Sequence, residues 1–253
     1  MKSSNPALGG KTFEQYQPGI QTAGVMTING TVNKTLILLA LVIIPAVWVW
    51  DMFYASGIGT EAGIQNASLM YWLYGGVFGG LIVALVTVFK KPWAPYTAPI
   101  YAILEGLALG GISAVFEAQF SGIVFQAVAL TIGTLFAMLV AYRTGLIKVT
   151  EKFRMGVVSA AMGIFLFYIL SFVLGLFGIN MAFLYSGGLL GILFSLFVVI
   201  IAALFLVLDF DLIDKGAEHG APKYMEWYGA FALIVTLIWL YFSLLRLLSV
   251  LRQ

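Results

Sequence analysis

The sequence predicts an all-α integral membrane protein, built as a bundle of seven transmembrane helices. Of its 253 residues, 62% are hydrophobic and only 9% are charged, whereas an ordinary soluble domain has about 25% charged residues. The apolar residues also come in repeated uncharged runs of about 20 residues, the length that crosses a hydrocarbon core of ~30 Å as a helix. A membrane barrel would instead show strands of alternating polarity. Both observations therefore favour helical spans.

Seven apolar runs follow one another in a single membrane domain, which we place at residues 35–253. We expect the spans at about residues 35–53, 70–89, 96–116, 122–142, 156–178, 189–208 and 228–250. Residues 1–34 are polar and glycine-rich, and they show no apolar core of a signal peptide. This first segment is therefore predicted to be a polar N-terminal tail in the cytoplasm.

Lysine and arginine predict the orientation, because short cytoplasmic loops hold the excess of positive charge. In the expected topology, 11 of the 13 basic residues fall in the tail and in the loops on its side, and only Arg246 and Arg252 fall on the other side. This distribution places the N-terminus in the cytoplasm and the C-terminus outside. Arg246 lies inside the last apolar run, so we expect that span to be short, tilted or shielded by its neighbours.

Glycines at four-residue spacing predict close packing between the second and third spans. In the stretch YGGVFGG, Gly75 lies one turn from Gly79 and Gly76 one turn from Gly80, and EGLALGG repeats the spacing. Small residues at this spacing let membrane helices approach closely. The alternative is that membrane helices simply tolerate glycine at these positions.

One acidic residue, Glu105, lies about ten residues into the third expected span, and no basic residue lies within a helical turn of it. A charge near the bilayer centre costs roughly 2.5–3.5 kcal/mol, so this carboxyl group needs a partner, a proton or water. Two interpretations remain open. Glu105 either binds protons or contacts a cation inside the bundle, or it is a protonated residue that hydrogen-bonds a neighbouring helix.

Three carboxylates stand in the stretch LDFDLID, which ends the sixth expected span. At 100° per residue, Asp209 and Asp211 project about 200° apart, whereas Asp211 and Asp214 share a face of the helix. We therefore expect Asp209 to face the bundle, where it senses protons or contacts a cation. Asp211 and Asp214 are expected to turn toward cytoplasmic water. The alternative is a solvated, acidic helix end.

Several kinds of chemistry lack their usual residues in this chain. Cysteine is absent and the single histidine, His219, lies in a polar loop, so neither an HExxH zinc site nor a cysteine metal site can form. The chain also has no GxxxxGK[ST] phosphate loop. We expect no enzyme activity and no cofactor. The net charge of +2, without a clustered basic surface, gives no case for nucleic acid.

Four segments, in the same order, resemble spans three, four, six and seven of the Bax inhibitor/YccA-like membrane proteins. They are APIYAILEGLALGGISAVFE, GIVFQAVALTIGTLFAMLVAY, GILFSLFVVIIAALFLVLDFDLID and LYFSLLRLL. The polar start NPAL…TF and the loop TGLIKVTEKFRMGV are similar to the bacterial subgroup, which implies a bacterial inner (cell) membrane. The resemblance implies a seven-helix fold. It also implies the activity of some members, which are pH-sensitive calcium leak channels gated by a pair of aspartates.

On this resemblance, Asp209 corresponds to the family's aspartate at the end of span six, and Glu105 to its glutamate in span three. Thr236 stands where the family has its second aspartate, so this chain lacks that partner. Asp211 and Glu226 both lie at the cytoplasmic end of the expected bundle. Either of them is a candidate to replace the missing aspartate as a proton-sharing partner of Asp209.

Two functions therefore compete. The first is a pH-sensitive cation leak channel of the cell membrane, for calcium by the resemblance, gated by protonation of buried carboxylates. The second, which the YccA side of the resemblance implies, is a non-conducting regulator that binds other membrane proteins, such as a quality-control protease. Both the missing second aspartate and the polar tail favour it. An intramembrane hydrolase ranks far below both. The expected partners are the lipid bilayer, calcium ions or other membrane proteins.

Overall fold

The computed structural model describes residues 24–55, 67–178 and 188–253. Within these ranges the chain forms seven helices that are long and apolar enough to cross a membrane, which confirms the predicted fold class. They are α2 (Ile28–Ala55), α4 (Ala67–Phe89), α5 (Ala94–Gln119), α6 (Ile123–Arg143), α7 (Glu151–Leu176), α8 (Leu189–Glu218) and α9 (Met225–Leu251), with a short 3-10 helix, η1 (Lys91–Trp93), before α5.

Several helices extend beyond the apolar runs that predicted them. α2 begins at Ile28, so residues 28–34 of the expected tail belong to the first helix, and residues 1–23 lie outside the described residues. α8 continues to Glu218, ten residues past the predicted end of its span. The apolar pattern marks the part of a helix that meets hydrocarbon, and not the point where its hydrogen bonds end. The carboxylates of LDFDLID therefore lie within a helix, and not at its end.

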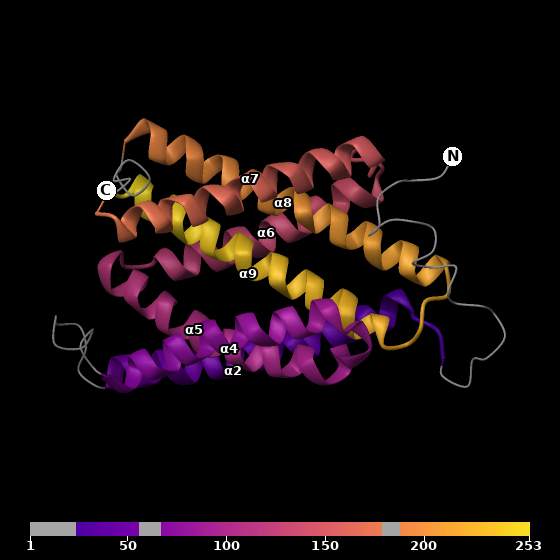
Figure 1. Ribbon diagram of the computed structural model, residues 1–253, viewed down its shortest axis with the longest axis horizontal. Helices are drawn as coiled ribbons and strands as arrows, with labels where there is room; N and C mark the ends of the chain where they lie inside the picture. Colours follow the sequence, from indigo (N-terminus) through magenta and orange to yellow (C-terminus); the bar gives the residue numbers. More distant parts are fainter. Residues whose placement is uncertain (1–23, 56–66, 179–187) are drawn as a thin grey trace.

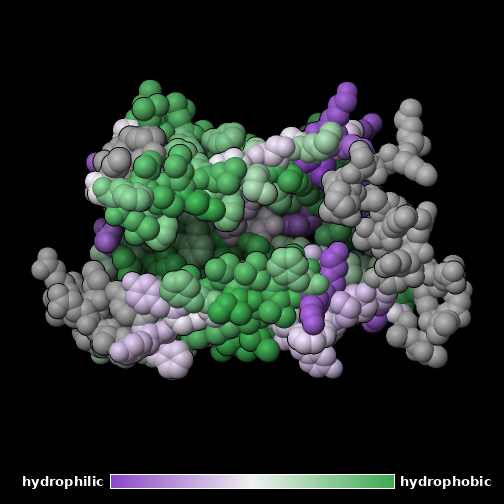
Figure 2. Space-filling model, in the orientation of Figure 1, coloured by the Kyte–Doolittle hydropathy of each residue, from purple (hydrophilic) through white to green (hydrophobic). Residues whose placement is uncertain are grey.

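Consecutive helices run in opposite directions, so the bundle has two distinct ends (Figure 1). α2, α5, α7 and α9 begin at one end, and α4, α6 and α8 finish there. We call this the basic end, because most of the basic residues lie close to it: Lys34, Lys90, Lys91, Arg143, Lys148, Lys152, Arg154, Lys215 and Lys223. In Figure 2 a broad apolar belt covers the middle of the molecule, as expected for a surface that faces lipid.

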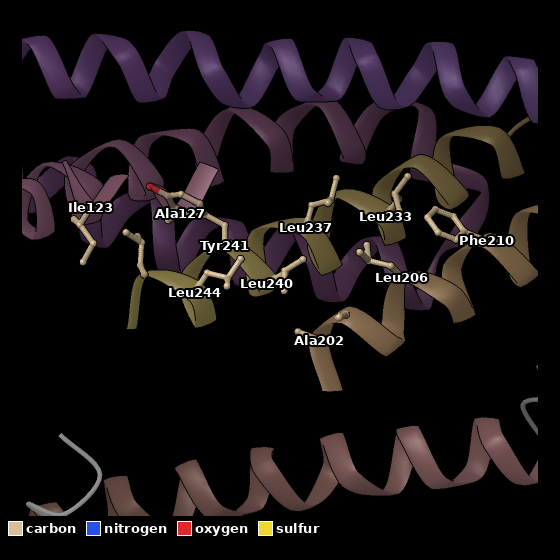
Figure 3. Packing of buried hydrophobic residues seen from close by; sticks show 12 residues of the cluster. Ile123, Ala127, Ala202, Leu206, Phe210, Leu233, Leu237, Leu240, Tyr241 and Leu244 are labelled. Carbon is tan, nitrogen blue, oxygen red and sulfur yellow. The ribbon is translucent and has the colours of Figure 1, made fainter. Parts of the chain in front are cut away.

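The last helix, α9, runs through the middle of the bundle. It lies between α2, α4 and α5 on one side and α6, α7 and α8 on the other (Figure 1), and it contacts α2, α5, α6 and α8. α4 packs mainly on α5, and α7 packs on α8. The largest group of buried side chains joins α6, α8 and α9, where Leu206 of α8 and Leu240 of α9 are fully buried (Figure 3).

Glycines bring three of the helices close together. A Cβ atom added to Gly76 of α4 would lie 2.6 Å from the carbonyl oxygen of Leu104 in α5, which confirms the close packing predicted for these spans. Gly106 and Gly110 of α5 make a second such contact, with α2, where a Cβ atom would collide with the α2 backbone. α5 is therefore packed tightly between α2 and α4.

The charged residue Arg246 does not interrupt the helix of the last span. α9 is continuous from Met225 to Leu251. Nη1 of Arg246 donates a hydrogen bond of 2.5 Å to the hydroxyl of Tyr168 in α7, and its guanidinium group lies 5.6 Å from the centre of the Phe194 ring in α8. Arginine over an aromatic face is attracted by the ring electrons. Of the three arrangements expected for this span, shielding by neighbouring helices is confirmed.

Candidate functional site at the α8–α9 interface

Asp209 lies on the face of α8 that packs against α9, and only 8% of its surface is exposed. The sequence predicted that this aspartate faces the bundle, and it does. Thr236 of α9 hydrogen-bonds its side chain. Thr236 is about 16 Å along the axis of α9 from its first residue, at 1.5 Å per residue. The carboxyl group is therefore deep in the bundle.

The second carboxyl oxygen of Asp209 is not satisfied. Within the described residues, Oδ2 is buried and has no hydrogen-bond partner. Asp209 also takes part in none of the ion pairs found in that part of the chain. The phenol of Tyr228, near the start of α9, lies within electrostatic range of Asp209. A buried polar atom without a partner in a native structure indicates strain, a missing water or ion, or a functional role.

Apolar side chains flank Asp209 on both sides along α8. Leu206 lies one turn from Asp209, on the side away from the basic end, and belongs to the large α6–α8–α9 cluster. Ile213, one turn toward the basic end, packs with Met26, Ala221 and Met225 in a separate buried cluster. Residues four apart share a helix face, so Ile213 lies between Asp209 and the basic end. The site is thus a single carboxyl group enclosed by apolar packing at either side.

Asp211 does not turn toward water, so the prediction for this residue is wrong. Its side chain is 8% exposed and pairs with Arg154 of α7 at 2.5 Å and with Lys215 at 2.8 Å. Asp211 does point away from Asp209, as its position on the helix predicted. The face of α8 that carries Asp211, however, is covered by α7 and does not meet water. Asp214 is partly exposed, at 20%, and lies 3.7 Å from Arg143. Asp211 therefore ties α7 to α8.

Glu226, the other candidate partner for Asp209, is engaged elsewhere. Its carboxylate is fully buried at the start of α9, where it pairs with Lys34 and, at 2.9 Å, with Lys223. It also accepts hydrogen bonds of 2.9 Å from the backbone nitrogen and from the hydroxyl of Thr27, beside the start of α2. Gly30 leaves room for the carboxylate, since a Cβ atom there would collide with it. Glu226 thus fastens α2 to α9 at the basic end.

Glu105 is half-buried in the interface between α5 and α4. A Cβ atom added to Gly80 of α4 would lie 2.8 Å from its Oε2 atom, and the ring of Tyr101 lies on the same side. The structure therefore does not bring Glu105 together with Asp209, whose neighbours come from α8 and α9. Its position is that of a polar side chain between two closely packed helices.

The partners of these acids were only partly visible in the sequence. The Asp211–Lys215 pair has the i, i+4 spacing of neighbours on a helix, so the sequence alone indicates this contact. The Arg154 and Lys34 contacts join helices that are distant in sequence, so no local pattern indicates them. Among the described residues, no three His, Cys, Asp or Glu side chains lie close enough to hold a metal ion.

Comparison with known proteins gives one match. The family model described as Bax inhibitor 1 like matches residues 5–253, which is nearly the whole chain. No curated protein and no solved structure matches the sequence.

Proposed function

The chain belongs to the Bax inhibitor 1-like family, and we propose that it is a pH-sensitive cation leak channel in which protonation of Asp209 controls passage. The observation that carries this proposal is the buried carboxyl group of Asp209, whose Oδ2 atom has no hydrogen-bond partner in the described part of the chain. A proton and a cation can each balance a negative charge at that oxygen, so they compete for it. By resemblance to the calcium-leaking members of the family, the cation is calcium, which takes oxygen ligands.

The direction of the pH effect follows from the surroundings of Asp209. An ionised carboxylate at this depth costs free energy unless water or a cation reaches it. A neutral carboxyl group removes that cost, and the apolar side chains of Leu206 and Ile213 on either side can stay packed. The leak should therefore be small while Asp209 is protonated. It should increase as the pH rises through the titration of Asp209.

Calcium release from loaded liposomes across about pH 6 to 8 tests the proposal, because a buried carboxyl group can titrate in that window. Asp209→Asn keeps the shape of the neutral acid and cannot ionise, so its flux should be low and independent of pH. Asp214→Asn is the matched control, since Asp214 is partly exposed beside Arg143. It should keep the pH dependence of the unmodified protein. Equal behaviour of the two variants would remove the special role of Asp209.

A non-conducting membrane regulator is the second candidate, and Thr236 is the observation that favours it. This threonine stands where the family resemblance expects a second aspartate, so the two-carboxylate site of the calcium-leaking members is incomplete. In this function the chain binds other membrane proteins, such as a quality-control protease. Liposome flux that stays at the level of protein-free vesicles at every pH would exclude the leak and leave the regulator. Flux above that level would exclude the regulator in its non-conducting form.

We further propose that the chain lies in a bacterial inner membrane with its N-terminus in the cytoplasm, and that it is not an enzyme. The gathering of lysine and arginine at the basic end supports this orientation, since cytoplasmic loops carry the positive charge. A reporter fused after Gln253 should be active outside the cytoplasm, and one inserted at Lys148 should be active inside. Cytoplasmic activity of both would mean that α9 does not cross the membrane.

A further inference from the structure

A cavity of about 540 Å³ lies between α2, α5, α6 and α9, apart from the Asp209 site. Its lining residues include no charged side chain. Three hydroxyl groups contribute to the lining, those of Ser113, Thr131 and Tyr241, and nearly all the other side chains are aliphatic. A volume of this size is in the range of pockets that hold small organic molecules. The lining selects a ligand that is almost entirely apolar.

The cavity opens toward the lipid between α2 and α6. Val47 of α2 and Val128 of α6 line it and are 60% and 41% exposed. Ile43 and Ile132, each one turn farther along, line it as well and are similarly exposed. Residues of α5 and α9 form the floor of the cavity between α2 and α6. Among them are Leu237 and Tyr241, whose side chains project from the same side of α9 in Figure 3. A molecule can therefore enter sideways from the hydrocarbon of the bilayer.

The cavity occupies one half of the membrane thickness. On α2 it extends from Leu39, near the middle of the helix, to Trp50, close to its end at Ala55. On α6 it extends from Val124, at the start of the helix, to Leu135. Eleven residues of helix measure about 16 Å, which is half of a ~30 Å hydrocarbon core. The cavity thus matches the depth of a single lipid leaflet, the one farther from the basic end.

One hydrogen-bond donor remains unused at the outer part of the cavity. The hydroxyl groups of Ser113 and Tyr241 are 2.7 Å apart and share one hydrogen bond, and no other hydrogen bond of either is found in the described residues. Two hydroxyls carry two protons, and their mutual bond uses one. The hydroxyl of Thr131 is already donated to the carbonyl of Ala127. A ligand with a carbonyl oxygen beside Ser113 would accept the remaining proton.

Because the cavity is open to the lipid along one side, we call it the groove. We propose that the groove binds one acyl chain of a membrane lipid from the leaflet farther from the basic end, with the ester carbonyl of that lipid at the Ser113–Tyr241 pair. The apolar lining, the one-leaflet depth, the opening between α2 and α6 and the spare donor all fit this ligand. The proposal does not depend on ion passage, and it holds equally for a conducting or a non-conducting protein.

Photolabelling of the unmodified protein tests the site without any substitution. The full chain is reconstituted in vesicles with a phosphatidylglycerol that carries a diazirine on one acyl chain, and labelled residues are mapped by mass spectrometry. Labelling should concentrate on groove residues of α2, α5, α6 and α9, including the buried floor. Labels spread evenly over all lipid-facing helices, without an excess in the groove, would overturn the proposal.

Native mass spectrometry of the protein released from these vesicles measures how many lipids stay bound. Val128→Trp fills the groove and should reduce the retained lipid at least fivefold. Leu81→Trp, at an exposed position of α4 outside the groove, is the matched control and should change retention less than twofold. Equal retention in both variants, each eluting as a folded protein in size-exclusion chromatography, would contradict a specific lipid site.

A comparison of ester and ether lipids tests the carbonyl contact. A diether lipid has the same chains but no carbonyl oxygen, so the unmodified protein should retain the diester form about 2- to 10-fold better, as one hydrogen bond allows. The double variant Ser113→Ala/Tyr241→Phe removes both donors and should lose this preference. An unmodified protein that retains both lipids equally would overturn the assignment of the carbonyl to this pair.

Discussion

Glu226→Gln is the substitution whose effect the structure specifies most fully. The carboxylate of Glu226 is fully buried and accepts two hydrogen bonds of 2.9 Å from Thr27, besides its ion pairs with Lys34 and Lys223. Glutamine keeps the size of the side chain, but it has one acceptor oxygen where glutamate has two, and no charge. The two lysines then lose their counter-ion, and the amide nitrogen of the glutamine faces donors.

The expected loss of stability is about 2–4 kcal/mol. Breaking a buried ion pair costs ~3–5 kcal/mol, and the figure is reduced here because the Lys34 and Lys223 side chains are 17% and 50% exposed and therefore partly hydrated. For a chain of this length, 1 kcal/mol shifts the melting temperature by roughly 2–4 °C. Glu226→Gln should therefore lower the melting temperature in detergent by roughly 5–15 °C.

Thermal unfolding followed by size-exclusion chromatography measures this shift. Glu218→Gln is the matched control, because Glu218 is exposed near the end of α8 and takes part in none of the ion pairs of the described residues. Exposed substitutions of this kind usually change stability by less than about 0.5 kcal/mol. A similar melting temperature for the two variants would refute the reasoning that Glu226 fastens α2 to α9.

Three further predictions concern other contacts. Gly106→Leu should prevent stable folding or lower stability by more than about 3 kcal/mol, because the new leucine side chain would collide with the α2 backbone. Gly163→Leu is the control and should be tolerated in the same thermal assay, because Gly163 has open space around it. Arg154→Met should destabilise by about 1–2 kcal/mol, since Asp211 keeps one of its two cations; an unchanged melting temperature would show that α7 is held by other contacts. Glu105→Gln should leave the pH dependence of calcium flux unchanged, and a loss of that dependence would contradict the separation of Glu105 from the Asp209 site.

The sequence predicted the seven helices because their signal is local. Twenty consecutive apolar residues in a helix are recognisable without knowing what surrounds them. The inward position of Asp209 was also predictable, from its depth in an apolar run and from its angle to Asp211. Helix ends were less visible, because α2 and α8 continue as helices into polar sequence at the basic end.

The contact between Asp211 and Arg154 could not be predicted, since it depends on how separate helices pack. The angular argument correctly separates Asp211 from Asp209, but it treats the far face of α8 as a surface in water. α7 covers that face and brings Arg154 to within 2.5 Å. In the same way, the register that places Thr236 against Asp209 is fixed by side chains packed between α8 and α9, and no spacing along one helix encodes it.

The segment before α2 connects the Asp209 site to the basic end. Met26 is almost fully buried against Gly216 of α8, whose absent side chain leaves room for the sulfur atom, and its backbone nitrogen donates a hydrogen bond of 2.7 Å to the carbonyl of Ala221. Met26 also packs with Ile213, which lies one turn from Asp209 on the same helix. In the proposed leak channel, this apolar cluster lies between Asp209 and the basic end. The next residue along the chain, Thr27, is held by Glu226, so the contact that fastens α2 to α9 also holds Met26 in place. In this proposal, ionisation of Asp209 deep in the bundle would favour opening, and the Glu226 contacts at the basic end would oppose it.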